Sequence, residues 1–350
     1  MTRCRVALAV GLLAIGGALF HAQAPLGPLS PSQPLAHAFT QIAPGVYSAV
    51  GIGTPTAGSN SAVIVNQDDV VVVDAHISPE SGRALLRDIK TITDKPVRVL
   101  VDTHFHYDHA NGNQVFAPMA EIIGHEYTRK RLAGDILQKG MFSELLTSLP
   151  RQLDDLKARA AAEQSPDARA RLEQQVRGQE AFTRQVSETK PTPPNVTLND
   201  QLTLYRGERE IRLIYLGRGH TGGDVVVYLP KERVLCSGDL LVNQIANLVD
   251  GYVNEWPAAL EKLRGLDFTD VIPGHGDPFK GKERIDWFQA YLRDLWTQAQ
   301  KLHADGIPAP EAARRVDMAA HKPHYPGING PGVPLAAVSR IYAVMDGRAE

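Results

Sequence analysis

Four metal-ligand side chains stand within six positions of this 350-residue sequence. The run is HFHYDH at residues 104–109, directly after the apolar segment 98–102, which is typical of a β-strand. In an extended or turning segment, His104 and His106 point the same way and can bind one metal ion. Asp108 and His109 follow in a turn and can reach a second ion. A buried histidine pair or a solvated loop is the alternative, and neither accounts for four ligand types so close together.

Three further loops, each after an expected strand, carry one more ligand type. They are GRGHTGGD at 217–224 with His220, CSGDL at 236–240 with Asp239, and IPGHG at 272–276 with His275. Alone, each is a common glycine-rich turn or helix cap. Together with the first run they fit two metal ions, with His104, His106 and His220 on one, Asp108, His109 and His275 on the other, and Asp239 between them.

Between these loops, expected strands alternate with expected helices. The segments 61–65 and 70–74 are rich in β-branched residues and end at Asn or Asp, which indicates strands. Ser78, Pro79 and Glu80 begin a helix, because Ser caps it, Pro suits its first position and an acid favours its first turn. The expected strands are 46–52, 61–65, 70–74, 98–102, 121–124, 211–216, 224–229, 233–237 and 270–272, and the expected helices include 78–93, 257–265, 283–303 and 335–346. Each half is β-rich with flanking helices, which predicts two packed sheets with helices outside.

Residues 128–190 interrupt this alternation. Leu149, Leu153 and Leu156 form an apolar stripe at helical spacing, and Ser165-Pro166 starts a second helix. We therefore expect an inserted helical hairpin. Its few apolar residues require it to pack on something, and the hypothesis is a wall or lid of the substrate cleft. The alternative is that the hairpin contacts a second copy of the chain. In that case the protein would be a homo-oligomer.

The N-terminus has the pattern of a signal peptide. Arg3 and Arg5 precede an uncharged apolar stretch at 6–20, which is shorter than the ~20 residues of a membrane span. We expect a signal peptide over 1–24, a Pro-rich linker over 25–38, one domain over 39–350, and export, most simply to the periplasm; an uncleaved anchor is the alternative. The net charge of −2 gives no basic excess for nucleic acid, so a small molecule is the expected partner.

The spacing of these motifs resembles the metallo-β-lactamase superfamily of αββα metallohydrolases over about residues 39–305. The resemblance implies an α+β four-layer αββα sandwich with the helical hairpin inserted, and the two ligand trios given above. Asp74 matches an aspartate that supports the ligands by hydrogen bonds, and Thr103 and Thr221 flank ligand histidines and are candidates for the same role. An Asp at 239 departs from the class B lactamases, which have Cys or Ser there, and is typical of glyoxalase-II-like hydrolases.

The expected activity is hydrolysis with two Zn²⁺ ions per chain. A hydroxide bridging the metals attacks the carbonyl of a cyclic amide or ester, and β-lactamase activity is one candidate. Asp108 is the candidate catalytic residue, since it borders the water and can pass a proton to the leaving group. The alternatives are a thioesterase or glyoxalase-II-like hydrolase and a non-catalytic zinc-binding interaction protein. Cys236, within an expected strand, is interpreted as a small core residue.

Overall fold

The computed structural model describes residues 34–349, and the chain from Leu35 onward forms one compact unit. The expected signal peptide and most of the expected linker lie outside the described residues. The linker was expected to reach residue 38, but strand β1 (His37–Ala43) begins earlier, because the backbone amides of Ala36 and His37 donate to the Asp88 carboxylate. Within residues 34–349, none of the helices has the length and apolarity that a membrane crossing requires.

The first sheet has seven strands in chain order. They are β1, β2 (Val46–Gly51), β3 (Ser61–Val65), β4 (Val70–Val73), β5 (Val97–Val101), β6 (Glu121–His125) and β7 (Val196–Leu198). Strands β1 to β4 pair antiparallel, and β4 to β7 pair parallel. In β4 the side chains alternate between two apolar clusters, with Val71 and Val73 between the sheets and Val70 and Val72 on the other face. A strand buried on both faces needs such an unbroken apolar run.

The second sheet has six strands. Their order is β13 (Phe279–Lys280), β12 (Asp270–Pro273), β11 (Val234–Gly238), β10 (Val225–Leu229), β9 (Arg209–Tyr215) and β8 (Gln201–Arg206). Only β11 and β12 pair parallel. Cys236 on β11 lies in the cluster between the two sheets, and burial raises the pKa of its thiol, so it is a core side chain.

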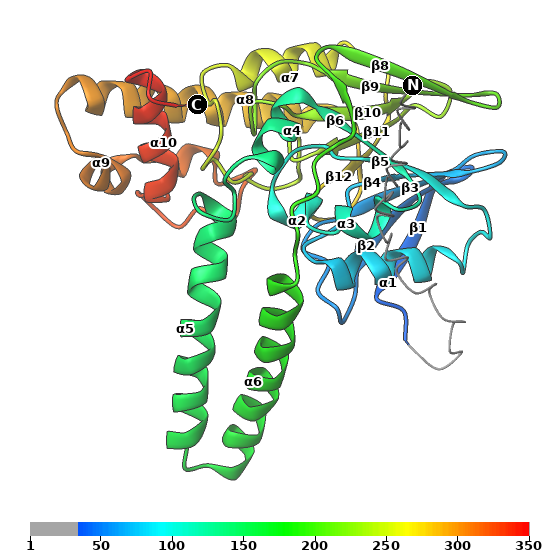
Figure 1. Ribbon diagram of the computed structural model, residues 1–350. Coiled ribbons are helices and arrows are strands. Elements are labelled where there is room, and N and C mark those ends of the chain that lie inside the picture. Colours follow the sequence, from blue (N-terminus) through cyan, green and yellow to red (C-terminus); the bar gives the residue numbers. More distant parts are fainter. Residues whose placement is uncertain (1–33, 350) are drawn as a thin grey trace, which may run out of the picture. The chain divides into compact units, whose positions relative to one another are not determined.

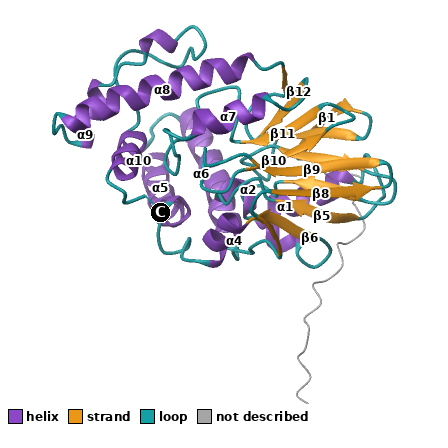
Figure 2. Ribbon diagram, turned by 90° about the horizontal axis from the view of Figure 1, so that it is seen from above, coloured by secondary structure: helices purple, strands orange, loops and turns teal. Residues whose placement is uncertain are grey.

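Helices cover the outer face of each sheet, which gives the expected four layers (Figures 1 and 2). Leu85 and Ile89 of α1 (Pro79–Ile89) pack on the first sheet, together with Phe116 of α3 (Asn113–Phe116). Trp256 and Phe288 pack on the second sheet from the opposite side. The remaining helices are α2 (Tyr107–Ala110), α4 (Glu126–Ala133), α5 (Met141–Ala162), α6 (Pro166–Ser187), α7 (Trp256–Arg264), α8 (Glu283–Ala304), α9 (Ala309–Arg315), the 3₁₀ helix η1 (Ala319–His321) and α10 (Leu335–Met345).

The inserted hairpin consists of α5 and α6, which lie side by side and extend away from the sheets (Figure 1). It is shorter than the interval 128–190, because the first residues of that interval belong to α4, which contacts β6 and β7. The base of the hairpin packs on the metal-ligand run, with the rings of Phe142 and Tyr107 stacked 5.8 Å apart. The base is therefore a wall beside the run, whereas the outer turns lie away from it. Contact with a second copy through those turns stays a prediction.

Parallel strand pairs bring the ligand loops to one edge of the sandwich. Val73 of β4 pairs with Val101 of β5, so Asp74 and Thr103 emerge side by side. Gly238 of β11 likewise pairs with Pro273 of β12, so the loops after both strands meet. The two sheets are joined at this edge by backbone hydrogen bonds, including Val225 N to Thr103 O at 2.8 Å.

The chain beyond the ligand run approaches the Asp74 segment backbone to backbone at Gly112. A Cβ at Gly112 would lie 1.9 Å from the carbonyl oxygen of Ala75. We therefore expect Gly112→Ala to lower the free energy of unfolding by about 3 kcal/mol, as overpacking does. Denaturant unfolding measures this. Gly178→Ala is the control, since Gly178 lies in α6 with no atom near its Cβ position, and this change should stabilise by roughly 0.5–1 kcal/mol. Equal stabilities of the two variants would contradict the close approach.

Candidate metal centre

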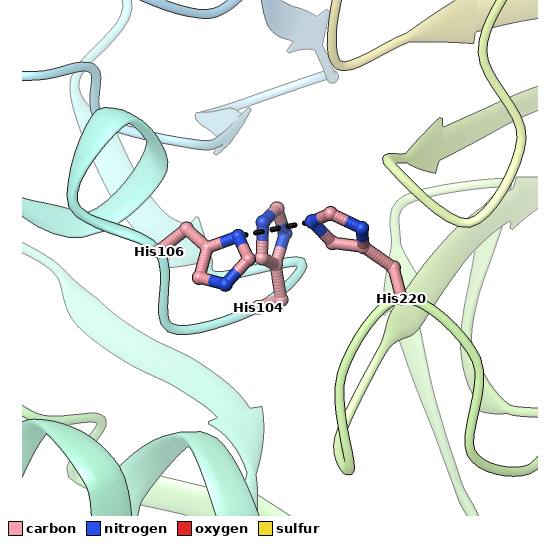
Figure 3. Close-up of side chains that lie close together, drawn as sticks. All are labelled: His104, His106 and His220. Atoms are coloured by element: carbon pink, nitrogen blue, oxygen red, sulfur yellow. Dashed lines mark hydrogen bonds between the residues drawn. The ribbon is translucent and has the colours of Figure 1, made fainter. Parts of the chain in front are cut away.

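Three histidines from two loops converge at this edge. His104, His106 and His220 offer ligand nitrogens that all lie within 4.8 Å of one another, and all three side chains are buried (Figure 3). His220 Nε2 lies 2.9 Å from His106 Nδ1. Two imidazole nitrogens so close need a proton or a cation between them. The loops expected from sequence to share one metal are thus brought together.

Hydrogen bonds from the opposite ring nitrogens orient two of these rings. His104 Nδ1 lies 3.0 Å from the hydroxyl of Thr103, which itself donates to Asp74 Oδ2 and so accepts from His104. His106 Nε2 lies 3.0 Å from Asp250 Oδ2. Each bond places the proton away from the convergence point, so His104 Nε2 and His106 Nδ1 present lone pairs toward it.

A second group forms beside the first. Asp108, His109 and His275 also place their ligand atoms within 4.8 Å of one another. Asp108 Oδ2 is 3.2 Å from His275 Nε2, and the two nitrogens His109 Nε2 and His275 Nε2 are 3.3 Å apart. Asp108 and His275 are the more open members, with 19% and 27% of their side chains exposed. This side of the centre therefore faces solvent, where a substrate can arrive.

Asp239 touches both groups. Its Oδ2 lies 3.5 Å from His220 Nε2 and 3.3 Å from His275 Nε2, and its Oδ1 lies 3.6 Å from His109 Nε2. Its neighbour Gly238 has a φ of 50°, and a Cβ there would strike the Thr103 side chain. A glycine is thus required immediately before Asp239 for the loop to turn toward the histidines.

The two groups differ in charge. Burial lowers the pKa of His104 and lowers that of His220 to about 3, so both imidazoles are neutral at pH 7. Burial also opposes a charge on His109, but the carboxylates around it, Asp239 first, raise its pKa to about 9. Carboxylate hydrogen bonds likewise outweigh burial at His275 and raise its pKa to about 11. Without a metal ion, the second group is held together by imidazolium–carboxylate pairs.

The donor set fits divalent zinc. His104 Nε2 and Asp239 Oδ1 are buried and have no hydrogen-bond partner among the described residues. Such groups are costly unless a ligand satisfies them. Imidazole nitrogens and carboxylate oxygens are the donors that zinc accepts besides thiolate. The buried unpaired atoms thus lie where a metal ion would complete their coordination.

The three residues expected to support the ligands lie at different distances from them. Asp74 accepts from the backbone and hydroxyl of Thr103, both at 2.9 Å, and its Oδ2 is 2.8 Å from His109 Nδ1. Thr103 contacts His104 as described. Thr221 acts one step further away, since its amide and hydroxyl donate to Asp224 and thereby order the turn that carries His220.

Asp250 is a functional residue that the sequence analysis missed. Besides accepting from His106, it lies 3.9 Å from Arg131 Nη1, and Arg340 donates to its backbone carbonyl. Burial opposes the charge on Asp250, but the His106 hydrogen bond together with the charges of His106, Arg131 and Arg340 outweighs burial and holds its pKa at about 2. No motif surrounds Asp250 in the sequence, and it reaches His106 only through the fold.

Replacing Asp250 with Ala should remove the acceptor that orients His106. Loss of such a partner lowers metal affinity by about 10- to 100-fold. Competition with a chelating dye measures the affinity. Asp267→Ala, at an exposed ion pair with Arg233, is the matched control and should bind zinc as wild type does. Equal zinc affinities of the Asp250→Ala protein and this control would show that the Asp250 contact does not orient a ligand.

Metal binding to the second group should release protons. His109 and His275 have pKa values above 7 in the metal-free protein, and a coordinating imidazole must be neutral. We expect release of about two protons per chain at pH 7 and an affinity that rises with pH up to the higher of the two pKa values. Titration calorimetry in buffers of different ionisation enthalpy counts them. A binding heat that is the same in every buffer would contradict this charge state.

Known proteins resemble this chain over most of its length. The Metallo-beta-lactamase superfamily matches residues 54–275, a span that contains all seven candidate ligands. A linear primary-alkylsulfatase from Pseudomonas sp. is 25% identical over 275 residues, which are 74% of this chain and 50% of that protein. The probable metallo-hydrolase YqjP of Bacillus subtilis is 27% identical over 259 residues, 68% of this chain and 73% of that protein. This chain thus spans only half the length of the alkylsulfatase.

A solved structure shares the fold of this chain. A metallo-β-lactamase structure from Pontibacter korlensis superimposes with a TM-score of 0.53 at 21% identity and covers 73% of this chain and 99% of that one. At this identity the likeness concerns the fold alone. The family match, however, extends over more than half of the chain. The chain belongs to the metallo-β-lactamase superfamily.

Proposed function

We propose that this protein is a metal-dependent hydrolase, which binds two zinc ions per chain and cleaves an ester or a cyclic amide. The position of Asp239 carries the proposal, because its carboxylate contacts His220 of one ligand group and His275 of the other. A carboxylate shared in this way can hold two cations close together and screen their repulsion. Seven ligand-type side chains also exceed what one tetrahedral zinc can use.

Bound zinc lowers the pKa of a coordinated water toward neutrality and polarises the bond to be cleaved. The chain's own residues supply the remaining functions. Asp108 is more exposed than Asp239, with 19% against 7% of the side chain accessible, so it can meet both the nucleophilic water and the substrate. We assign its carboxylate the role of orienting that water and transferring a proton to the leaving group.

The buried histidines of the first group have a positioning role. His104 and His106 are each fixed by a hydrogen bond from the ring nitrogen that faces away from the convergence point. Such ligands need no rearrangement when the reaction begins, and this preorganisation favours catalysis. Buried imidazoles with fixed orientations therefore support a catalytic centre over a passive zinc-binding protein.

A sulfate ester is the second candidate for the bond cleaved. The relative whose match spans 74% of this chain is a linear primary-alkylsulfatase. A β-lactam remains a candidate cyclic amide. The class B lactamases, however, have Cys or Ser at the position that corresponds to Asp239. A thioester remains the substrate expected by analogy with glyoxalase-II-like enzymes.

One substrate panel tests the proposal. Zinc-loaded protein is assayed side by side on a β-lactam, a lactone, a thioester and a primary alkyl sulfate, with kcat/KM as the readout. Turnover of the lactone or the β-lactam is expected. Preference for the alkyl sulfate would replace the carbonyl assignment by the second candidate, and failure on all four substrates would leave the non-catalytic alternative.

Asp239→Ala tests the shared carboxylate. We expect the variant to retain one zinc per chain after dialysis, where the wild type retains two, and to lose about 100-fold or more in kcat/KM, since a dinuclear site loses its second cation. Metal analysis and steady-state kinetics measure the two effects. Asp267→Ala is the control and should keep both. Full metal content and full turnover in the Asp239→Ala protein would refute the bridging role.

A further inference from the structure

A cavity of about 1050 Å³ lies between the loop 243–248 and the C-terminal segment 318–337. Its size is at the upper end of the ~300–1,000 Å³ typical of small-molecule pockets. Ile245 and Leu248 contribute to one wall, and Met318, Tyr325 and Val333 contribute to the other. Such a volume is large enough for a chain of many carbon atoms.

The walls carry no fixed charge. None of the residues that line this cavity is Asp, Glu, Lys or Arg, and the polar ones are Asn, Gln, Tyr and one exposed histidine, His324. A charged group placed inside would lose its hydration without gaining a partner. An apolar group would instead gain from leaving water. The chemistry of the lining thus selects an uncharged, apolar occupant.

One loop connects the lining of the cavity to the metal centre. The segment from Asp239 to Asp250 has both ends at the centre, because Asp239 contacts His275 and Asp250 contacts His106. The middle of the same segment, residues 243–248, lines the cavity. A loop of this length, held at both ends, keeps the cavity beside the ligand residues.

Asn243 fixes the cavity next to the open side of the centre. Its Nδ2 donates to the carbonyl of Asp277 at 3.2 Å, two residues beyond His275. Gly276 has a φ of 79°, and a Cβ there would lie 2.3 Å from the Asn243 side chain. The cavity lining therefore packs directly against the loop of His275, one of the two more exposed candidate ligands.

The far wall lies outside the part of the chain that matches the family. That match ends at residue 275, whereas Ala336 and Ala337 of α10 belong to the lining. Arg340 on the same helix donates to the backbone carbonyls of Asp250 and Gly251, both at 3.1 Å. The C-terminal helix thus holds the wall of the cavity and the segment behind His106 at the same time.

From these observations we infer that the cavity binds an uncharged, apolar arm of the substrate, while the bond to be cleaved lies at the metal centre. This inference rests on the proposed function for the identity of the reaction, and on the geometry alone for the binding of the arm. The substrate class is an amphiphile, with a polar, hydrolysable head and an uncharged apolar tail.

Ligand binding tests the location without any turnover. The probes are decanol and decanoate, which displace the neutral fluorophore N-phenyl-1-naphthylamine below micellar concentration. Both should bind the metal-free protein, and zinc loading should raise the affinity of decanoate at least ~10-fold while leaving that of decanol within about twofold, since only the carboxylate reaches the centre. Equal responses of decanol and decanoate to zinc would overturn the inference.

Two cavity-filling variants test the site itself. Ala336→Trp fills the cavity from the exposed first turn of α10, and Gln244→Trp fills it from the opposite loop. If one variant misfolds, the other still tests the site. Each should weaken decanol binding at least ~10-fold, as loss of two or more buried methylenes would. Ser339→Trp adds the same bulk on α10 at an exposed position outside the lining and should bind as wild type does. Unchanged decanol binding in both cavity variants would overturn the inference.

A turnover experiment is the third test of the inference. Across esters of increasing chain length, kcat/KM should rise by about fourfold per methylene until the cavity is full, and Ala336→Trp should shift the preferred length downward. A rate that does not depend on chain length in an active enzyme would overturn the inference. Failure of every ester to react would count against the proposed function, and the two binding experiments would still decide whether the cavity takes the arm.

Discussion

The carboxylate of Asp74 is the contact on which the ligand run depends. It is buried at the end of β4 and accepts three hydrogen bonds from the loop after β5, two from Thr103 and one from His109. Through Thr103 it also determines which nitrogen of His104 carries the proton. A buried carboxylate left without these donors would be costly, so strand, loop and ring orientation are stabilised together. Asp74 adopts a φ of 64°, an uncommon conformation for a residue with a side chain, and these bonds maintain it.

The asymmetry of charge across the centre follows from where the carboxylates lie. His104 and His220 remain neutral, because burial and, at His220, the neighbouring His106 outweigh the effect of Asp239, whereas His109 and His275 lie among Asp108 and Asp239 and hold protons. A metal ion replaces those protons as the positive partner of the same carboxylates. The fold is therefore stable around the second group with or without the ion, because one cationic partner substitutes for the other. The first group lacks this substitute, and its unpaired His104 nitrogen is the more dependent on metal.

Much of the fold and the ligand set could be predicted from the sequence, because buried strands such as β3 and β4 are unbroken β-branched runs and the ligands stand in short motifs. Strand β8 was missed, although Leu202 and Leu204 alternate with polar residues, which is the pattern of a half-buried strand. The supporting role of Asp250 could not be predicted either. Its partner His106 lies 144 positions away, and only the packing of the loop 239–250 brings the two together. The direction of the hairpin could not be predicted either, because the position of its two ends near the ligand run does not determine where two stiff helices extend.

The two parts of the chain contribute different properties to one site. The segment that matches the family supplies the strand ends, and those strand ends determine where the metal ligands and the attacking water lie. The residues after 275 add α8, α9 and α10, and their packing on the second sheet creates a wall that the ligand loops alone do not have. Arg340 connects the two parts, because it binds the backbone next to the acid that orients His106. Arg340 therefore joins the C-terminal helix, which lines the cavity, to the loop whose Asp250 contacts His106.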